Sequence, residues 1–358
     1  MPKEKSMTRN LNHDDDASSK YRFNTWDNRV AVPWSDLNHV VLFLIMMKFG
    51  VIDFISFSGV CKSWRSLALD NKSRFMASRP PMSMSISNRA YEKECYCILE
   101  DFEERKFKTL LPHSVGRICV GLTCGYLVLF GRETRDFWLV NPITRQELHF
   151  PDVPDYLHRD VPIIKAILVF SRSISEFVFV VVHKFTNIIW FSISGKGAWN
   201  HVHSTYPVHD LHAFKGKVYT LTNGCRLFEM RLNPEPELTL LDIENFWKPS
   251  FLYPEFVVNS GENLYVMDHN VFNPYKFEEL DFGKMMWVTL EKTLTFFISN
   301  LNCYSAAINP ESWADHPSQY KTYSFCHVDS IDKDRKYKLF TDIMWYFPHR
   351  CLDVDLID

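Results

Sequence analysis

The sequence lacks a surplus of charge of either sign. Its 358 residues contain 40 Lys and Arg against 43 Asp and Glu, which gives a formal net charge of −3. No long basic run occurs, and this balance argues against nucleic acid as a partner. The acidic triplet Asp14–Asp16 lies in a polar N-terminal stretch and is typical of a solvated tail.

Long apolar runs are also missing. The most apolar stretch, Val40 to Met47, is too short to cross a bilayer and is followed by Lys48. The N-terminal stretch has no apolar segment of the kind that directs secretion. We therefore predict no membrane partner, a disordered tail over residues 1–29, and a cytoplasmic or nuclear protein.

Common catalytic and metal-binding motifs are absent as well. The 9 cysteines are odd in number and scattered, without the Cys-x-x-Cys pair of a zinc site, which indicates small core residues in a reducing compartment. Gly195-Lys196-Gly197 lacks the strand–turn–helix setting of a phosphate loop and is typical of a hairpin turn. No Gly-x-Ser-x-Gly nucleophile motif occurs. We predict no catalytic residue and no cofactor.

One histidine-rich segment is the best metal candidate. His201 and His203 would share a face of a strand, and His209, Asp210 and His212 follow closely. No further ligand stands at a firm spacing, so a loop of solvated or hydrogen-bonded histidines is the preferred interpretation, and no metal is predicted.

A second segment suggests ligand binding but favours a turn. Arg145 follows the Asn141-Pro142 pair and could bind a carboxylate or phosphate. Because Asn-Pro pairs begin turns, we predict that the segment closes two strands.

What the chain has in abundance is aromatic side chains. Aromatics make up 15% of the residues, including 29 Phe and 10 Trp, and such stiff, large side chains suit the cores of β-sheets. A chain of 358 residues is also too long for one small core, so two structural units are expected.

The first unit is helical. Apolar residues between Val51 and Ala68 recur at steps of three and four, the period of a helix buried on one side. Gly50 fits a helix end, and Asp53 stands close to the start of the next helix. We predict a module over residues 30–75 with helices at about 36–48, 52–58 and 59–70. An ordinary helical subdomain packed on a larger body remains an alternative.

Two motifs give this module a family resemblance. Trp34-Ser-Asp-Leu37 and, after an apolar helix, Val60-Cys61-Lys62-Ser63-Trp64-Arg65 are similar to the F-box of plant ubiquitin-ligase receptors. The sequence departs from that family at Asn38, where Pro is usual, and at His39, where an acidic residue is usual.

From about residue 90 the pattern changes from helical to strand-like. Short runs rich in Val, Ile, Phe, Tyr and Trp alternate with turn residues. Three paired runs begin at Gly125, Gly216 and Gly261, a weaker copy begins at Glu176, and successive copies start about 40 to 50 residues apart, the length of one propeller blade. We predict a linker over 76–88 and an all-β propeller of five or six blades over 89–358, giving an α+β multidomain chain. A β-sandwich is the alternative.

The second unit also resembles a family. Gly125-Tyr-Leu-Val, Leu139-Val-Asn-Pro-Ile-Thr-Arg145 and Leu148-His-Phe-Pro are similar to plant proteins that pair an F-box with a kelch-like propeller, long catalogued as a domain of unknown function.

Together the resemblances imply a substrate receptor of a Skp–cullin–F-box ubiquitin ligase. The module would bind a Skp-type adaptor, and through it a cullin, while the propeller holds an unidentified target protein. Six residues are the expected adaptor contacts: Leu37, Val40, Val41, Val60, Cys61 and Trp64. The alternatives are a propeller interaction protein whose degenerate F-box recruits no ligase and, with no motif in its favour, an enzyme.

Overall fold

Three helices form the N-terminal module, and the other regular elements among the described residues that follow it are strands. The computed structural model describes Trp34 and residues 37–79, 81–87, 95–101, 105–154, 164–171, 176–215, 217–222, 225–231, 236–244, 255–259, 263–270, 273–289, 294–299, 306–308, 337–342, 344–346 and 352–354. The predicted disordered tail, residues 1–29, lies outside the described residues.

The helices are α1 (His39–Met46), α2 (Val51–Ser58) and α3 (Lys62–Ala77). Their shared core contains Leu42, Met46, Phe57 and the stacked rings of Phe54 and Phe75, whose centroids lie 4.1 Å apart. The predicted helix of 59–70 is wrong at both ends, since Gly59 and Val60 form a turn and α3 continues to Ala77.

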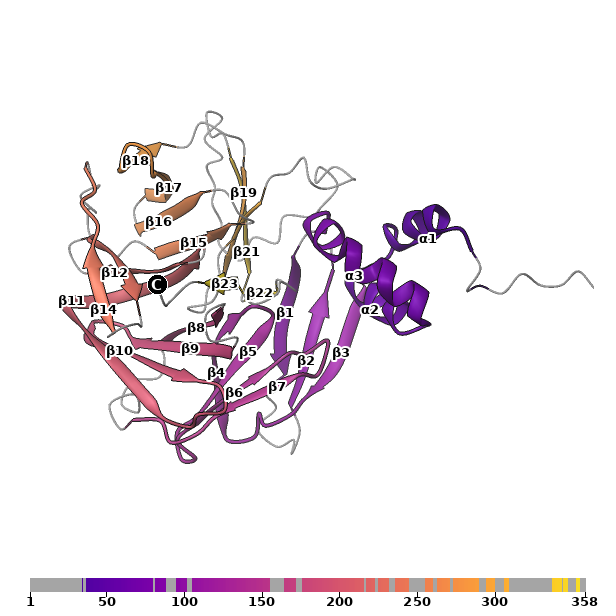
Figure 1. Ribbon diagram of the computed structural model, residues 1–358, viewed down its shortest axis with the longest axis horizontal. Coiled ribbons are helices and arrows are strands. Elements are labelled where there is room, and N and C mark those ends of the chain that lie inside the picture. Colours follow the sequence, from indigo (N-terminus) through magenta and orange to yellow (C-terminus); the bar gives the residue numbers. More distant parts are fainter. Residues whose placement is uncertain are drawn as a thin grey trace, which may run out of the picture.

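Mostly antiparallel units of strands follow one another around the molecule (Figure 1). The first contains β1 (Met82–Ser87), β2 (Cys95–Glu100) and β3 (Lys106–Leu111), and the C-terminal strand β22 (Trp345–Tyr346) pairs with β1. The second unit contains, in order, β4 (Arg117–Thr123), β5 (Tyr126–Gly131), β6 (Asp136–Val140) and β7 (Glu147–Phe150).

The third and fourth units share one long strand. The third contains β8 (Ile164–Ser171), β9 (Glu176–His183) and β10 (Thr186–Ile193), with β23 (Leu352–Val354) beside β8. The fourth contains β12 (Lys217–Thr222), β13 (Leu227–Arg231) and β14 (Glu237–Leu240). The 16-residue strand β11 (Trp199–Phe214) joins them, pairing with β10 mainly through its first half and with β12 through its second.

The last sheet follows the fourth unit along the chain. It contains β15 (Glu255–Asn259), β16 (Leu264–Asn270), β17 (Asn273–Asp281) and β18 (Met286–Thr289), extended by β19 (Leu294–Ser299), β20 (Ala306–Ile308) and β21 (Tyr337–Asp342). Successive four-stranded sheets arranged in this way are a β-propeller, which confirms the predicted fold class.

Strand β9 shows how the blades are stabilised. Phe179 and Val181 belong to the core shared with the second unit, whereas Val178, Val180 and Val182 belong to the core shared with the fourth. Alternate residues of a strand point to opposite faces, so both faces of this sheet are buried. This explains the six consecutive apolar residues Phe177 to Val182, because a strand with one exposed face would alternate apolar and polar residues.

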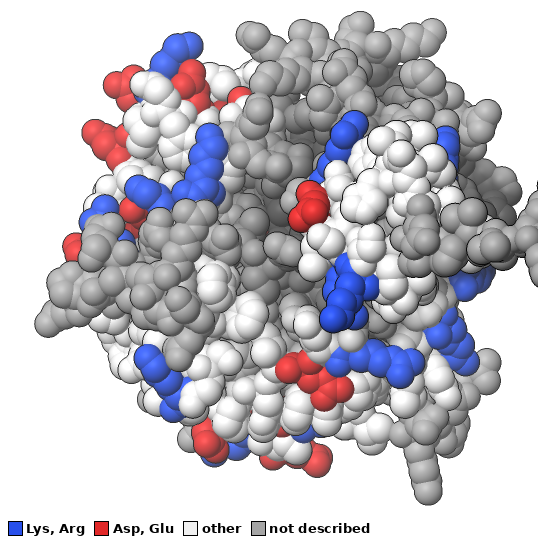
Figure 2. Space-filling view, turned by 45° about the vertical axis from the view of Figure 1, so that its right-hand side comes forward, with Lys and Arg blue, Asp and Glu red and all other residues white. Residues whose placement is uncertain are grey.

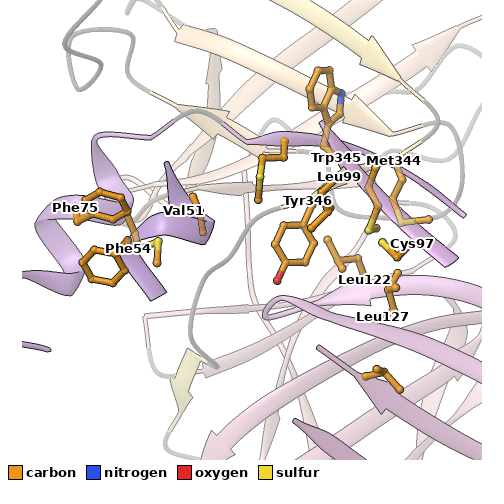
Figure 3. Close-up of a cluster of buried hydrophobic side chains, with 14 of the residues drawn as sticks. Val51, Phe54, Phe75, Cys97, Leu99, Leu122, Leu127, Met344, Trp345 and Tyr346 are labelled. Atoms are coloured by element: carbon orange, nitrogen blue, oxygen red, sulfur yellow. The ribbon is translucent and has the colours of Figure 1, made fainter. Parts of the chain in front are cut away.

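The predicted linker over 76–88 is wrong. Residues 76 and 77 end α3, and residues 82–87 are strand β1, paired on both sides with β2 and β22. The helical module also shares one continuous core with the first two blades. Figure 3 shows Val51, Phe54 and Phe75 on the helical side and Trp345 and Tyr346 on the propeller side of this cluster.

Candidate protein-docking surface

Six large apolar side chains of the helical module are exposed to solvent: Leu69 of α3, and five that lie on α1 or just before α1 and α3. The exposed fractions are 71% for Trp34, 65% for Val40, 59% for Leu44 and 58% for Val60, and Val41 is exposed as well. We call these five residues the docking face. Val40 and Leu44 lie one helical turn apart on α1, opposite the buried Leu42 and Met46.

A hydrogen bond holds the parts of the docking face together. His39 Nε2 lies 3.2 Å from Ser63 Oγ, so the start of α1 contacts the first turn of α3. Val40 follows His39, and Val60 lies just before α3, so the two valines flank one junction. In Figure 2 the helical module faces the reader at right as a largely uncharged surface with basic side chains near its edge. An uncharged, exposed apolar area with a polar rim is typical of a protein-binding surface.

The structure divides the six predicted adaptor contacts into two groups. Val40, Val41 and Val60 are exposed on the docking face, whereas Leu37, Cys61 and Trp64 are half-buried. Trp64 stacks on Phe57 with ring centroids 4.5 Å apart, and Leu37 packs against the module's own core. These side chains help to support the surface from below.

Two exposed residues of the docking face, Trp34 and Leu44, are not among the six residues predicted from the sequence. Trp34 belongs to the motif Trp34-Ser-Asp-Leu37, but the sequence does not show whether its side chain is exposed. Leu44 lies four residues after Val40, and this helical spacing was an available signal.

Asn38 forms the start of the helix that carries the docking face. It is the N-cap of α1, and its side-chain Oδ1 accepts a hydrogen bond from the backbone N–H of Val40 at 2.8 Å. Its φ of −54° is also within the range that Pro adopts.

The histidine-rich segment is divided between an exposed and a buried half of one strand. His201 and His203 stand on the exposed face of β11, whereas His209, Asp210 and His212 are buried in its second half. Asp210 pairs there with Lys165 at 3.1 Å. Among the described residues no group of three or more His, Cys, Asp or Glu side chains could hold a metal ion.

The two turn predictions are confirmed. Gly195 and Gly197, both with positive φ, connect β10 to β11. Asn141 Oδ1 accepts hydrogen bonds from the backbone N–H groups of Ile143 and Thr144, at 3.0 and 2.9 Å, and so closes β6 to β7.

The described cysteines, 6 in number, carry free thiols. Burial raises the pKa of Cys97 and of Cys119 to about 12. These two thiols therefore stay protonated and act as core side chains. No described helix combines the length and apolar character needed to cross a bilayer.

Two families match the chain. Residues 34–76 match the F-box domain, and residues 98–324 match the family described as KIB1-4 beta-propeller. No curated protein matches the sequence.

Solved structures show only a distant likeness. A protein of unknown function from Bacteroides caccae is 8% identical, with 58% of this chain and 72% of that chain covered and a TM-score of 0.34. AztD from Citrobacter koseri is 10% identical, with 63% and 61% covered and a TM-score of 0.34. YCF48 from Cyanidioschyzon merolae is 9% identical, with 55% and 69% covered and a TM-score of 0.35. Nothing about activity follows from likenesses this low.

Proposed function

Because the chain belongs to the KIB1-4 beta-propeller family and carries an F-box domain ahead of the propeller, we propose that it is a substrate receptor of a Skp–cullin–F-box ubiquitin ligase. The F-box module binds a Skp-type adaptor, and the adaptor connects the receptor to a cullin. The propeller binds the target protein. As in the similar plant receptors with kelch-like propellers, the receptor contributes no catalytic residue.

The observation that carries this proposal is the docking face. Large apolar side chains exposed on one small module are costly in water, and they are explained if a partner covers them. Val40 and Val60 flank the contact between α1 and α3, so the partner would contact both helices. Rigid apolar anchors at the centre of an interface contribute most of the binding energy.

The mechanism is proximity. A target held on the propeller stays near the ubiquitin-charged enzyme, so its effective concentration there is raised without chemistry by the receptor. The continuous core between module and propeller supports this role, because it keeps the two binding surfaces at a fixed separation. Target contacts are expected on the loops between strands, and the complex is expected in the cytoplasm or nucleus.

Reconstitution tests the proposal. The purified full chain, a Skp-type adaptor and a cullin are mixed and separated by size-exclusion chromatography. We expect one complex that contains all three proteins, and no complex of the chain with the cullin when the adaptor is omitted. Separate elution of the chain in the presence of both partners would remove the ligase function.

A second function is favoured by one observation. Asn38 and His39 stand where the F-box family usually has Pro and an acidic residue, and both lie at the start of the helix that carries the docking face. The alternative is a propeller interaction protein whose degenerate F-box recruits no ligase. Restoring the usual residue by Asn38→Pro distinguishes the two functions.

A further inference from the structure

Two turns of the third and fourth blades meet the middle of β11 at Val208. The backbone N–H of Phe185, in the turn between β9 and β10, donates to the Val208 carbonyl at 2.7 Å. Val208 also pairs with Thr222, whose N–H donates at 3.0 Å to the carbonyl of Arg226, in the turn between β12 and β13. Tyr206 lies two residues before Val208. We call the side chains of Phe185, Tyr206 and Arg226 the junction patch.

The junction patch lies at the end of the third blade that is remote from the helical module. Helices α2 and α3 line one side of a cavity whose other side includes Phe170 and Phe177, at the turn between β8 and β9. Phe185 follows the opposite end of β9, and at about 3.3 Å per residue the 8 residues of this strand span roughly 26 Å. A partner on the junction patch therefore leaves the docking face accessible to an adaptor.

Phe185 combines exposure with an unfavourable backbone conformation. Its φ is 69°, in the left-handed region that large side chains rarely adopt, and 42% of its surface is exposed. Gly or Asn would fit this turn position with less strain. The backbone geometry thus disfavours an aromatic ring here, and strained residues cluster at binding sites.

Arg226 is an exposed cation in a fixed orientation. Its Cζ atom lies 4.1 Å from the ring centroid of Tyr206, and its guanidinium donates a hydrogen bond to the Tyr206 hydroxyl. Tyr206 is itself half-buried beside the buried Phe228, with ring centroids 6.5 Å apart. Among the described residues no carboxylate pairs with Arg226. In the same patch Lys184 is buried and pairs with Glu255 at 2.6 Å, so Arg226 supplies the uncompensated charge.

This arrangement is complementary to a carboxylate beside an apolar group. A guanidinium has five N–H donors, of which Tyr206 takes up one, and its planar edge matches the two oxygens of a carboxylate. Because the arginine is already stacked on an aromatic ring, it loses little conformational freedom when a ligand binds. The exposed ring of Phe185 offers the neighbouring apolar contact.

We propose that the junction patch binds an acidic peptide segment of the target protein. A Glu or Asp carboxylate of the segment accepts two hydrogen bonds from Arg226, and an adjacent large apolar side chain packs on Phe185. That the segment belongs to a ubiquitination target rests on the proposed function. Peptide binding itself requires neither adaptor nor cullin, so its failure is distinguishable from failure of the ligase reconstitution.

Peptide selection with the full chain tests the patch. A phage-displayed library of random short peptides is first depleted on the double variant Phe185→Asn with Arg226→Gln and then selected on the natural chain. We expect enriched peptides in which Glu or Asp stands next to a large apolar residue. A synthetic enriched peptide should bind Arg226→Gln about tenfold more weakly than the natural chain, because a charged hydrogen-bonded pair is lost.

A change in the peptide gives the same comparison without any protein variant. The enriched peptide with Gln in place of its acidic residue should also bind the natural chain about tenfold more weakly. Phe185→Asn should weaken peptide binding while its urea midpoint is no lower than that of the natural chain, because Asn tolerates the left-handed conformation. A ring with only a structural role would not give this combination.

Lys215→Gln is the matched control. Lys215 is also an exposed cation beside an aromatic ring, with its Nζ 5.3 Å from the ring centroid of Phe214, but it lies at the other end of β12. This variant should bind the peptide like the natural chain.

Three outcomes of the selection would overturn the proposal: no enrichment after depletion, enriched peptides without an acidic residue, or equal effects of Arg226→Gln and Lys215→Gln. A dimer of the natural chain in size-exclusion chromatography that the double variant lacks would overturn it as well, since a second copy of the chain would then occupy the patch.

Discussion

Asn38 Oδ1 accepts a hydrogen bond from the backbone N–H of Val40 at 2.8 Å. The residue that departs from the usual F-box pattern therefore begins the helix whose first turn carries an exposed valine of the docking face. Pro would fix this first turn through its ring, whereas Asn38 fixes it through its side chain. The φ of −54° at position 38 is compatible with either residue.

Replacing Asn38 separates capping from adaptor recognition. Asn38→Ala removes the side-chain acceptor and should lower the free energy of unfolding by about 1 kcal/mol, the usual cost of a lost N-cap. Asn38→Pro should bind a Skp-type adaptor within about threefold of the natural chain, because the cap already fixes the turn. Calorimetry measures both affinities. If only the Pro variant binds, the chain is instead a propeller interaction protein whose degenerate F-box recruits no ligase.

One buried carboxylate contacts three blades of the propeller. Asp210 is fully buried, pairs with Lys165 of β8 at 3.1 Å, and accepts a hydrogen bond from the Phe256 backbone N–H of β15 at 2.7 Å. One side chain thus connects three blades. Asp210→Asn keeps the shape but removes the charge beside a buried cation, and should lower the free energy of unfolding by about 3 kcal/mol in urea titrations.

An ion pair with one half-exposed partner provides the control for Asp210. Lys217, half exposed, pairs with Glu229 at 2.8 Å, and Glu229 keeps Arg231 as a second partner. Lys217→Gln should cost no more than about 1 kcal/mol. Equal losses in the two variants would show that the buried pair has no special part in joining the blades.

A buried histidine makes stability depend on pH. Burial is the main cause that lowers the pKa of His212 to about 3, and the positive charge of Lys165 is the second cause. In the unfolded chain the pKa of this histidine is about 6.5. Its contribution to stability is therefore complete above about pH 6.5 and is lost as the pH falls toward 3. The slope should reach about 1.4 kcal/mol per pH unit. His212→Gln should flatten it, and His201→Gln, at an exposed position on the same strand, should not.

Asp136 titrates in a lower pH range than His212, so the effects of the two residues on stability can be separated. Burial raises the pKa of Asp136, but hydrogen bonds from Arg117, Thr134 and His149 and the charge of Arg117 outweigh it and lower the pKa to about 2. Stability from Asp136 is present above its ordinary value of 3.8 and is lost as the pH falls through 2. A loss of stability between pH 6.5 and 4 that persists in His212→Gln would contradict the assignment to His212.

The propeller could be predicted because its strands carry local signals. The predicted copies that begin at Glu176 and Gly216 coincide with the observed β9 and β12, because apolar β-favouring residues and turn residues lie next to each other in the chain. Strand β1 was missed although Met82, Met84 and Ile86 alternate with serines. Its partner β22 lies more than 250 residues later, and such a pairing leaves no local trace.

The candidate site was predictable in part for a similar reason. Helical spacing placed Val40 and Val41 on α1, but it could not show which face the neighbouring helices cover. Trp64 was assigned to the surface, and the structure instead stacks it on Phe57. The ion pair of Lys165 and Asp210 could not be predicted from the sequence either, because the two side chains meet only when the third and fourth blades pack together.

The affinity of the full chain for a purified Skp-type adaptor tests the central claim most directly. The natural chain should bind, and the double variant Val40→Asp with Val60→Asp should bind at least about a hundredfold more weakly, because two charges replace apolar anchors. Leu110→Asp, at an exposed apolar residue of the propeller, is the matched control and should bind like the natural chain. No binding by the natural chain, or an equal loss in the control, would contradict the account.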